Sequence, residues 1–322
     1  MSGGPDSTAL LLLIDRWRET SGVSVAAATV DHGLRPESAD EARAVAALCA
    51  ARGVPHHILA RAGPPPSSRV QERLRASRYD LLCGCAAAIG ADTVVTAHHA
   101  DDQAETVLMR LLRGSGPAGL AGMRLWTRRG AMTIARPLLS HHKRDLMALC
   151  DAEGVSYALD PSNTDAAFRR AALRRLAPVL EAEGLTNAAL TRLARRAAQA
   201  EDALGWAIEK ARDEIPCARA EGRAAWDASA LARLPFELRL RFLDEEVARI
   251  GRADPRLERL ERLVERLDAA CAEGAPFAAT LGGCSVGLRN GIVSVSPAPR
   301  RRGGAPRCGV SRSVLGNVRS DA

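Results

Sequence analysis

The sequence predicts an α/β fold in which helices cover a parallel β-sheet, followed by a C-terminal region that is mainly helical. In the first half of the chain, short runs rich in β-branched residues alternate with amphipathic stretches of helical length. This alternation is the pattern of a parallel sheet with crossover helices. From residue 186 the alternation stops, and Ala, Leu, Arg and Glu dominate. A chain of 322 residues is long enough for two domains of ordinary size.

Hydrophobic periodicity places the elements of the first half. We expect strands at 23–30, 56–60, 93–97 and 132–135, and helices at 7–19, 37–52, 69–89, 101–113 and 141–153. The change of pattern near Gly184 predicts an α/β domain at 1–185 and a mainly helical domain at 186–298. Residues 299–322 are rich in Pro, Gly, Ser and Arg, which predicts a disordered tail.

The second half has two further local signals. Leu257, Leu260, Val264 and Leu267 recur at helical spacing and predict a stripe that faces the core, as the stretch from 186 to about 272 reads as helices. A late β-hairpin is expected where 284–288 meets 292–295 across Asn290-Gly291, because that dipeptide suits a turn with left-handed dihedral angles.

Composition limits the class of protein. The formal net charge of +7 favours a polyanionic partner such as nucleic acid, although a coding bias toward arginine gives the same balance, since only Lys143 and Lys210 are lysines. The 8 cysteines form no Cys-x-x-Cys pair, which favours small buried side chains in a reducing compartment. No apolar run reaches the roughly 18 residues that a membrane span needs. We therefore expect a cytoplasmic protein without a membrane partner.

The strongest chemical signal is the segment Ser2-Gly3-Gly4-Pro5-Asp6-Ser7-Thr8, which runs directly into an apolar helix. Two glycines let the backbone approach a ligand closely, the hydroxyl groups are hydrogen-bonding partners, and the helix start offers free N–H groups to an anion. The segment therefore predicts a phosphate-binding loop. It is not a Walker loop, because no Gly-Lys-Ser/Thr follows. An ordinary Gly/Ser helix cap is the alternative interpretation.

Two polar segments follow strands of the predicted sheet, where such sheets place ligand-binding residues. The first is Val30-Asp31-His32-Gly33-Leu34-Arg35, and the second is the run from His98 to Thr106. In the second, Asp102, Glu105 and Thr106 fall on one face of a new helix. Carboxylates arranged in this way can hold Mg²⁺ or an ammonium group. Helix-dipole chemistry and a zinc site are alternatives, although the zinc interpretation lacks a third ligand.

Several later segments suit contacts with phosphate. Arg110 and Arg113 lead into the loop Gly114-Ser115-Gly116, and arginines beside a flexible loop can bind nucleic acid or ATP. The segments Arg136-Pro137-Leu138-Leu139 and Asp160-Pro161-Ser162-Asn163 stand at element ends. Taken one at a time, these segments are turns or solvated helix ends.

Together and in this order, these motifs resemble those of bacterial tRNA(Ile)-lysidine synthetases, which belong to the PP-loop ATP pyrophosphatase superfamily. The resemblance covers roughly residues 1–180. It implies an adenine nucleotide α-hydrolase-like domain followed by a helical domain. It also implies an ATP-dependent ligase that uses ATP, Mg²⁺ and L-lysine. The enzyme would adenylate C2 of wobble cytidine 34 in the isoleucine tRNA with the CAU anticodon, and lysine would then displace AMP.

The resemblance also implies roles for individual residues. The ATP phosphates would bind Ser2, Gly3, Gly4, Pro5, Asp6, Ser7 and Thr8. Asp31, Asp102 and Glu105 would bind lysine and Mg²⁺, with Asp102 as the metal ligand, and His98 and Arg78 would act near the activated base. The tRNA would contact Arg110, Arg113, Arg169 and Arg170.

The sequence departs from the family pattern in three places. Met1 directly precedes Ser2 where the family has a buried strand, so we expect that strand upstream. Arg169-Arg170 stands where an Arg-Asn pair is expected, and the C-terminal region is short. A PP-loop tRNA thiolase is the main alternative, disfavoured by the lack of paired cysteines. A non-catalytic nucleotide-binding regulator is a second alternative, and a homodimer is among the assemblies that the sequence allows.

Overall fold

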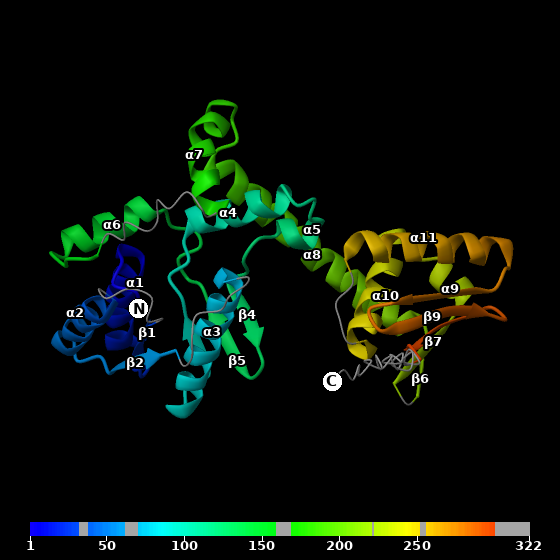
Figure 1. Ribbon diagram of the computed structural model, residues 1–322, viewed down its shortest axis with the longest axis horizontal. Coiled ribbons are helices and arrows are strands. Elements are labelled where there is room, and N and C mark those ends of the chain that lie inside the picture. Colours follow the sequence, from blue (N-terminus) through cyan, green and yellow to red (C-terminus); the bar gives the residue numbers. More distant parts are fainter. Residues whose placement is uncertain (32–37, 62–69, 159–168, 221, 252–255, 300–322) are drawn as a thin grey trace, which may run out of the picture. The chain divides into compact units, whose positions relative to one another are not determined.

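The structure is a computed structural model that describes residues 1–31, 38–61, 70–158, 169–220, 222–251 and 256–299. It divides into two compact units, Met1–Asp202 and Ala203–Ala322 (Figure 1). No helix of the described residues is long and apolar enough to cross a membrane. The predicted tail lies outside the described residues from position 300 onward, and the predicted domain boundary after residue 185 stays a prediction.

The first unit alternates helices and strands in the predicted way. Its strands are β1 (Ala27–Asp31), β2 (His56–Ala60), β3 (Thr93–Val95), β4 (Trp126–Arg129) and β5 (Met132–Ala135). Its helices are α1 (Pro5–Ser21), α2 (Ser38–Ala51), α3 (Val70–Ala88), α4 (Ala100–Leu111), α5 (Pro117–Leu120), α6 (Lys143–Ala152) and α7 (Arg169–Ala182), and α8 (Asn187–Glu214) begins in this unit and continues into the second. The predicted helices and strands are confirmed, apart from shifts at their ends.

Parallel pairing dominates the sheets of this unit. β1 pairs with β2 in parallel, from Ala27 opposite His56 to Asp31 opposite Ala60. β3 pairs in parallel with β5, and β4 pairs with β5 in the antiparallel direction, which gives a second sheet in the order β3-β5-β4. Between these two sheets the described strands share no ladder. The polar segments after β1 and β3 therefore start at the carboxyl ends of parallel strands, where ligand sites of such sheets lie.

Apolar packing fixes the helix that carries the phosphate loop. Leu10 and Leu12 of α1 form a buried cluster with Leu146 and Cys150 of α6. On its other side, Leu11 of α1 joins a cluster with residues of β1 and α2. Burial of a leucine side chain contributes about 1.5–3 kcal/mol, so α1 is held firmly from two sides. The loop before it is thereby given a rigid base.

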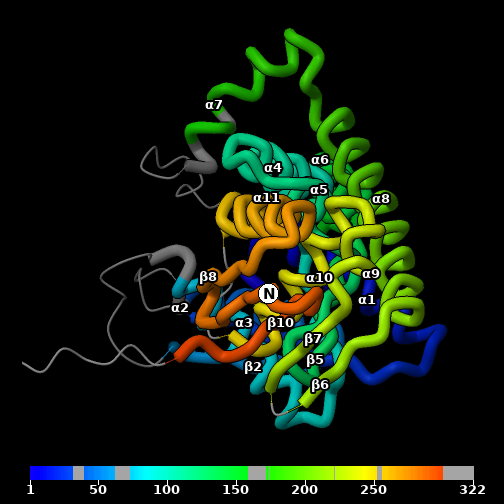
Figure 2. The backbone as a smooth tube through the Cα atoms, turned by 90° about the vertical axis from the view of Figure 1, so that its right-hand side faces the viewer, coloured from blue at the N-terminus to red at the C-terminus, as the bar shows by residue number. Residues whose placement is uncertain are grey.

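The second unit is built on a sheet of 5 antiparallel strands in the order β6-β7-β10-β9-β8. The strands are β6 (Ala218–Ala220), β7 (Arg223–Asp227), β8 (Phe277–Leu281), β9 (Cys284–Arg289) and β10 (Ile292–Pro297), and the helices are α9 (Ala228–Ala232), α10 (Phe236–Ile250) and α11 (Leu257–Glu273). α10 and α11 pack against the sheet around one apolar core (Figure 2). The predicted hairpin is confirmed, and both Asn290 (φ 51°) and Gly291 (φ 71°) adopt the left-handed conformation.

Two expectations need correction, and one strand was missed. The stretch from 186 to 272 is not helical throughout, because β6 and β7 form a hairpin inside it. These strands are rich in Ala and Arg, which carry little strand propensity, so that pairing of β7 with β10 decides their conformation. The antiparallel strand β4 was not predicted, since its residues are exposed and lack an apolar alternation. In the predicted stripe of α11, Leu257 is 41% exposed, because it stands in the first turn, before the helix reaches the core.

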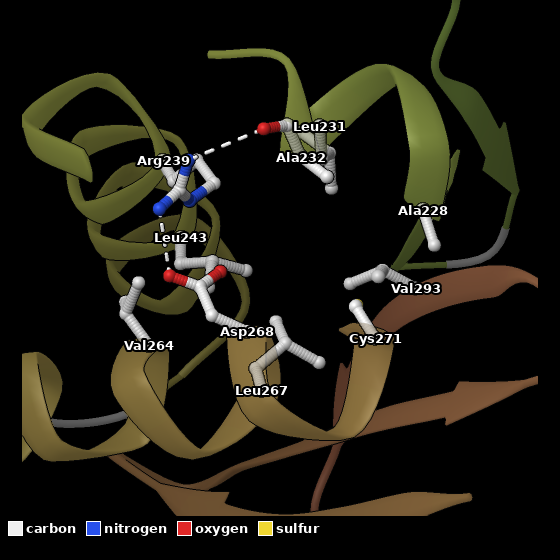
Figure 3. A pocket seen from close by; sticks show the side chains of 10 residues that line it. All are labelled: Ala228, Leu231, Ala232, Arg239, Leu243, Val264, Leu267, Asp268, Cys271 and Val293. Atoms are coloured by element: carbon white, nitrogen blue, oxygen red, sulfur yellow. Dashed lines mark hydrogen bonds and ion pairs between the residues drawn. The ribbon is translucent and has the colours of Figure 1, made fainter. Parts of the chain in front are cut away.

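The core of the second unit contains a cavity of about 20 Å³. Its walls are mainly apolar side chains from α9, α10, α11 and β10, and the ion pair between Arg239 and Asp268, 2.7 Å long, closes one side (Figure 3). A space of this size holds about one water molecule. The cavity is therefore a packing defect and not a substrate site.

Candidate active site

The phosphate loop is ordered by its own polar groups. Gly3 adopts φ 75°, a conformation that favours glycine, and its carbonyl accepts a hydrogen bond from Ala158 N at 2.9 Å. Gly4 is the N-cap of α1 and Pro5 occupies the first turn, where the missing N–H of proline costs nothing. Ser2 N donates to Ser7 Oγ at 3.1 Å. The loop thus presents the start of α1 as an anion-binding surface.

Two residues of the loop, Ser7 and Thr8, are buried. Thr8 is buried, and its N–H donates to Gly4 O at 3.1 Å, so part of its contribution is to the shape of the turn. Ser7 is also buried, and its hydroxyl donates to Gly4 O at 3.1 Å. The ATP-binding roles of Ser2 to Thr8 remain predictions for the individual side chains.

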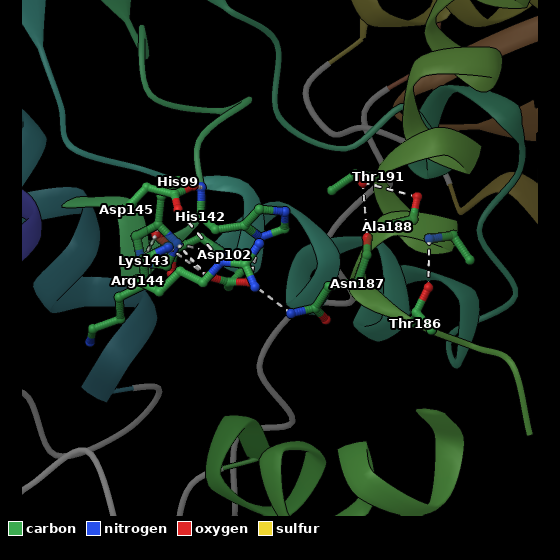
Figure 4. Close-up of polar contacts among 12 residues, drawn as sticks. His99, Asp102, His142, Lys143, Arg144, Asp145, Thr186, Asn187, Ala188 and Thr191 are labelled. Atoms are coloured by element: carbon green, nitrogen blue, oxygen red, sulfur yellow. Dashed lines mark hydrogen bonds and ion pairs between the residues drawn. The ribbon is translucent and has the colours of Figure 1, made fainter. Parts of the chain in front are cut away.

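The helix α4 begins at the second polar segment. Its N-cap is His99, with His99 N donating to Asp102 Oδ2 at 3.3 Å and Asp102 N donating to His99 Nδ1 at 3.4 Å (Figure 4). This reciprocal arrangement is a capping box, with histidine in the position that Ser or Thr usually takes. The cap fixes Asp102 at the start of the helix.

His99 lies among three carboxylates. Its Nε2 is 3.6 Å from Asp6 Oδ2 and 3.4 Å from Asp102 Oδ2, and its Nδ1 is 3.5 Å from Asp101 Oδ2. Burial lowers the pKa of His99, but the contact with Asp6 and the negative charges of Asp102 and Asp101 outweigh it, so the pKa lies above its ordinary value. The phosphate loop and α4 therefore meet at one buried side chain.

Asp101 connects this cluster to two further helices. Its carboxylate accepts hydrogen bonds from Lys143 N at 2.9 Å and from Asn187 Nδ2 at 2.7 Å, and it lies 3.3 Å from His142 Nδ1. Burial raises the pKa of Asp101, but these hydrogen bonds outweigh it and hold the pKa below its ordinary value. Asp101 thus joins α4 to the first residues of α6 and α8.

The remaining predicted catalytic residues take different places. Asp31 is half-buried at the carboxyl end of β1, and Glu105 is half-buried one turn after Asp102. His98 Nδ1 shares a hydrogen bond of 2.8 Å with the hydroxyl of buried Thr96. Arg78 of α3 is an exposed residue, yet desolvation lowers the pKa of its guanidinium group, and the charges of Tyr79 and, more weakly, Asp102 oppose this shift.

The predicted tRNA-binding arginines are less uniform. Arg110 Nη1 donates to Gly119 O at 2.7 Å and to Gly122 O at 2.8 Å, so it holds the glycine-containing loop after α4. Arg113 is exposed in the turn that follows α4. Arg169 and Arg170 begin α7, but their side chains lie outside the described residues, as do His32 to Arg35 and Asp160 to Asn163. Contacts of all four arginines with tRNA remain predictions.

Gln103 fixes the same loop from inside. Its buried amide donates to Met123 O at 2.9 Å and accepts from Met123 N at 2.7 Å. A Cβ atom at Gly122 would lie 2.7 Å from Gln103 Oε1, and Gly122 has φ 69°. Gly122 is therefore required both by its backbone conformation and by the space that Gln103 occupies.

We expect Gly122→Ala to lower the free energy of unfolding by about 2–3 kcal/mol, because the new methyl group displaces Gln103 and costs both hydrogen bonds. The matched control is Gly130→Ala, where φ is 59° but no atom lies within 4 Å of the new Cβ. Denaturant unfolding of both variants measures the difference. Equal losses would mean that backbone strain alone, and not the clash with Gln103, sets the effect.

Comparison with known proteins agrees with this geometry. Residues 1–180 match the model of a family described as the PP-loop domain. The chain is 50% identical over 307 residues to the tRNA(Ile)-lysidine synthase of a Methylobacterium species, covering 94% of this chain and 89% of that protein. It is 50% identical over 310 residues to the enzyme of that name from Methylobacterium nodulans, covering 94% and 91%. The chain belongs to the tRNA(Ile)-lysidine synthase family.

A solved structure with the same fold is the U34-tRNA thiolase NcsA from Methanococcus maripaludis with its [4Fe-4S] cluster, with a TM-score of 0.54 over 62% of this chain and 71% of that chain. At 18% sequence identity this likeness concerns the fold alone. The family match over residues 1–180 confirms the prediction of a PP-loop domain. The relatives are ATP-dependent ligases, in agreement with the predicted enzyme class.

Sequence reasoning missed His99 and Asp101 as parts of the site. The available signal was the spacing of three residues between His99 and Asp102, which is that of a capping box. That spacing did not reveal the contact with Asp6, because Asp6 is distant in sequence. Asn187 gave no signal at all, since only the folded chain brings α8 to Asp101.

Proposed function

We propose that this chain is a tRNA(Ile)-lysidine synthase that modifies the wobble cytidine of the isoleucine tRNA with the CAU anticodon. The observation that carries the proposal is the 50% identity to enzymes of that name over 94% of the chain. A second observation supports the proposal. His99 contacts both Asp6 of the phosphate loop and Asp102 of α4, so the loop lies beside carboxylates. Because its substrate is tRNA, the enzyme acts in the cytoplasm.

The first step consumes ATP. The O2 atom of the cytosine attacks the α-phosphorus, a P–O bond forms, and the bond to the β-phosphate breaks, so that pyrophosphate leaves. The backbone at Gly3 and Gly4 and the free N–H groups at the start of α1 hold the departing phosphates. Arg78 is the cation that we assign to stabilise negative charge near the activated base.

The second step replaces AMP by lysine. The ε-amine attacks C2, a C–N bond forms, and the C–O bond to AMP breaks. With a reference pKa near 10.4, the lysine side chain arrives as an ammonium group and must give one proton to a neighbouring carboxylate before its nitrogen can attack C2. Asp31, Asp102 and Glu105 supply carboxylates that bind this ammonium group. His98, hydrogen-bonded to Thr96, is the group we assign to act near the activated base.

The residues present fit a Mg²⁺ ion. Asp6 Oδ1 is buried and has no hydrogen-bond partner among the described residues, and Asp6 and Asp102 converge on the same nitrogen of His99. The described residues contain no group of three His, Cys, Asp or Glu arranged for a metal, but Mg²⁺ bound with a nucleotide needs only one or two carboxylates. Asp102, with Asp6, would hold the ion. When bound, it neutralises charge on the pyrophosphate.

We expect labelled lysine to enter the isoleucine tRNA with the CAU anticodon, with release of AMP and pyrophosphate, and not the methionine tRNAs that share this anticodon. Unstacked bases of RNA loops are the usual targets of sequence-specific recognition. Since the anticodon is the same, discrimination requires contacts outside it, for which the arginine-rich helices after residue 169 are candidates.

The measurement is incorporation of labelled lysine into both tRNA types, with ATP, at matched salt concentration. Equal labelling of the two tRNAs would contradict the specificity. Incorporation of sulfur instead of lysine would assign the chain to the thiolase reaction. ATP binding without any change in the tRNA would assign it to a regulatory role, and gel filtration of the same sample tests whether the chain forms a homodimer.

A further inference from the structure

The two histidines of the segment at 98–99 have different surroundings. His98 is half-buried and hydrogen-bonded to Thr96, whereas His99 is only 6% exposed and its ring nitrogens lie near the carboxylates of three aspartates. A buried cationic or polar side chain between carboxylates of two different elements fixes their separation. His99 therefore has a role that helix capping alone does not explain.

The role of Nε2 follows from the contacts of both ring nitrogens. Nδ1 lies 3.4 Å from Asp102 N, which requires an acceptor, and 3.5 Å from Asp101 Oδ2, which requires a donor. The first contact suits the neutral ring with hydrogen on Nε2, and the second suits the doubly protonated ring. Nε2 carries a hydrogen in both forms. In the remaining form, the neutral ring with its hydrogen on Nδ1, the lone pair of Nε2 would point at two carboxylate oxygens, which is repulsive.

The Nε2–H group thus stands between the phosphate loop and α4. It lies 3.6 Å from Asp6 Oδ2 and 3.4 Å from Asp102 Oδ2. These distances are long for hydrogen bonds, as is common for active-site groups that tighten when substrate binds. Without this donor, no hydrogen would stand between the carboxylates of Asp6 and Asp102 at this point.

We propose that His99 is a positioning residue whose Nε2–H group holds Asp6 of the phosphate loop and Asp102 of α4 at one fixed separation. The inference rests on the proposed function for its reaction, but the arrangement itself belongs to the ATP site. Asp101 completes it by holding the opposite side of the ring, and Asp101 is itself fixed by Lys143 N and Asn187 Nδ2.

Two substitutions separate this role from helix capping. In His99→Asn, the amide oxygen stands near the position of Nδ1 and can still accept from Asp102 N, but no donor reaches Asp6. In His99→Gln, the longer side chain places an amide N–H near the position of Nε2. Asparagine is also among the preferred N-cap residues, so His99→Asn preserves the start of α4.

We expect His99→Asn to lower the rate of tRNA adenylation by about a hundredfold, because a small displacement of reacting groups has that effect. The dissociation constant for ATP should rise about tenfold. His99→Gln should keep the adenylation rate within about tenfold of wild type and the dissociation constant for ATP within about threefold. The two variants should unfold at similar temperatures. Adenylation is measured in single turnovers without lysine, and ATP affinity by calorimetry.

The matched control is His142→Asn, because His142 is also a histidine N-cap with an aspartate three residues later. It should keep adenylation within about threefold, since Asp101 retains Lys143 N and Asn187. Equal losses in His99→Asn and His99→Gln, or full activity in His99→Asn, would overturn the proposal. So would a fall in unfolding temperature that parallels the loss of activity. A wild-type enzyme that binds ATP but forms no lysidine would contradict the proposed function, and the ATP affinities would still test the role of His99.

Discussion

Replacing Asp102 by asparagine is expected to lower lysidine formation by at least about a hundredfold. The side chain of Asp102 is 18% exposed, faces His99 Nε2 and interacts electrostatically with Arg78. Asparagine keeps its shape and can still accept the hydrogen bond from His99 N. The substitution therefore removes the negative charge that is proposed to bind Mg²⁺ or the lysine ammonium group while the start of α4 stays intact.

The measurement is the single-turnover rate of lysine incorporation at saturating Mg²⁺ and lysine. Asp145→Asn is the matched control, because Asp145 has the equivalent position in the capping arrangement of α6, where its Oδ2 accepts from His142 N at 3.2 Å. That variant should retain nearly full activity. Wild-type turnover of Asp102→Asn under these conditions would exclude Asp102 from binding either Mg²⁺ or lysine.

Val264→Asp is expected to destabilise the second unit by more than about 4 kcal/mol. Val264 is 0% exposed at the centre of α11, among side chains of α10 and the sheet. A carboxylate at this place is removed from solvent, and Arg239, which lines the same cavity, is already paired with Asp268. Burial of such a group costs several kcal/mol. This is a large share of the stability of an ordinary domain, so we expect a marked fall in the unfolding temperature of the unit.

Limited proteolysis and thermal unfolding measure this effect, with Ala269→Asp as the control. Ala269 lies on the exposed side of the same helix, so the same carboxylate there remains hydrated. Ala269→Asp should change stability by less than about 0.5 kcal/mol. Similar losses in the two variants would mean that the charge acts on α11 itself and not on the core.

The sequence predicted those parts of the fold that depend on local pattern. The strands at 56–60 and 132–135 agree with β2 and β5 to the residue, because short apolar runs between turn-forming residues specify them. β6 and β7 were missed, since their residues are typical of helices, and the pairing of β7 with β10 and of β6 with β7 makes them strands. The phosphate loop was predicted for the same local reason, with glycines and hydroxyl groups that lie next to one another in the chain.

The site was predicted only as far as neighbouring residues reveal it. His98 and Asp102 stand in one short motif, whereas the contact of His99 with Asp6 joins residues from opposite ends of the first hundred positions. Arg110 shows the reverse case. Its place beside a glycine loop suggested phosphate binding, but in the structure its Nη1 donates to the carbonyls of Gly119 and Gly122. No local pattern distinguishes these two uses of an arginine.

The contacts of Asp101 have a consequence for the order in which the protein assembles. Asp101 contacts His99, Lys143 and Asn187, and His99 in turn contacts Asp6. Four separate stretches of chain therefore meet at this point. Contacts across such long sequence separations form late in folding, because the intervening chain must first lose its freedom. During synthesis the N-terminal residues can thus form α1 and its loop early, but the acidic cluster reaches its final geometry only when Asn187 has left the ribosome. The PP-loop match ends at residue 180, before that point, so Asp101 receives one of its hydrogen bonds from the first residue of α8, a helix that lies outside the matched region.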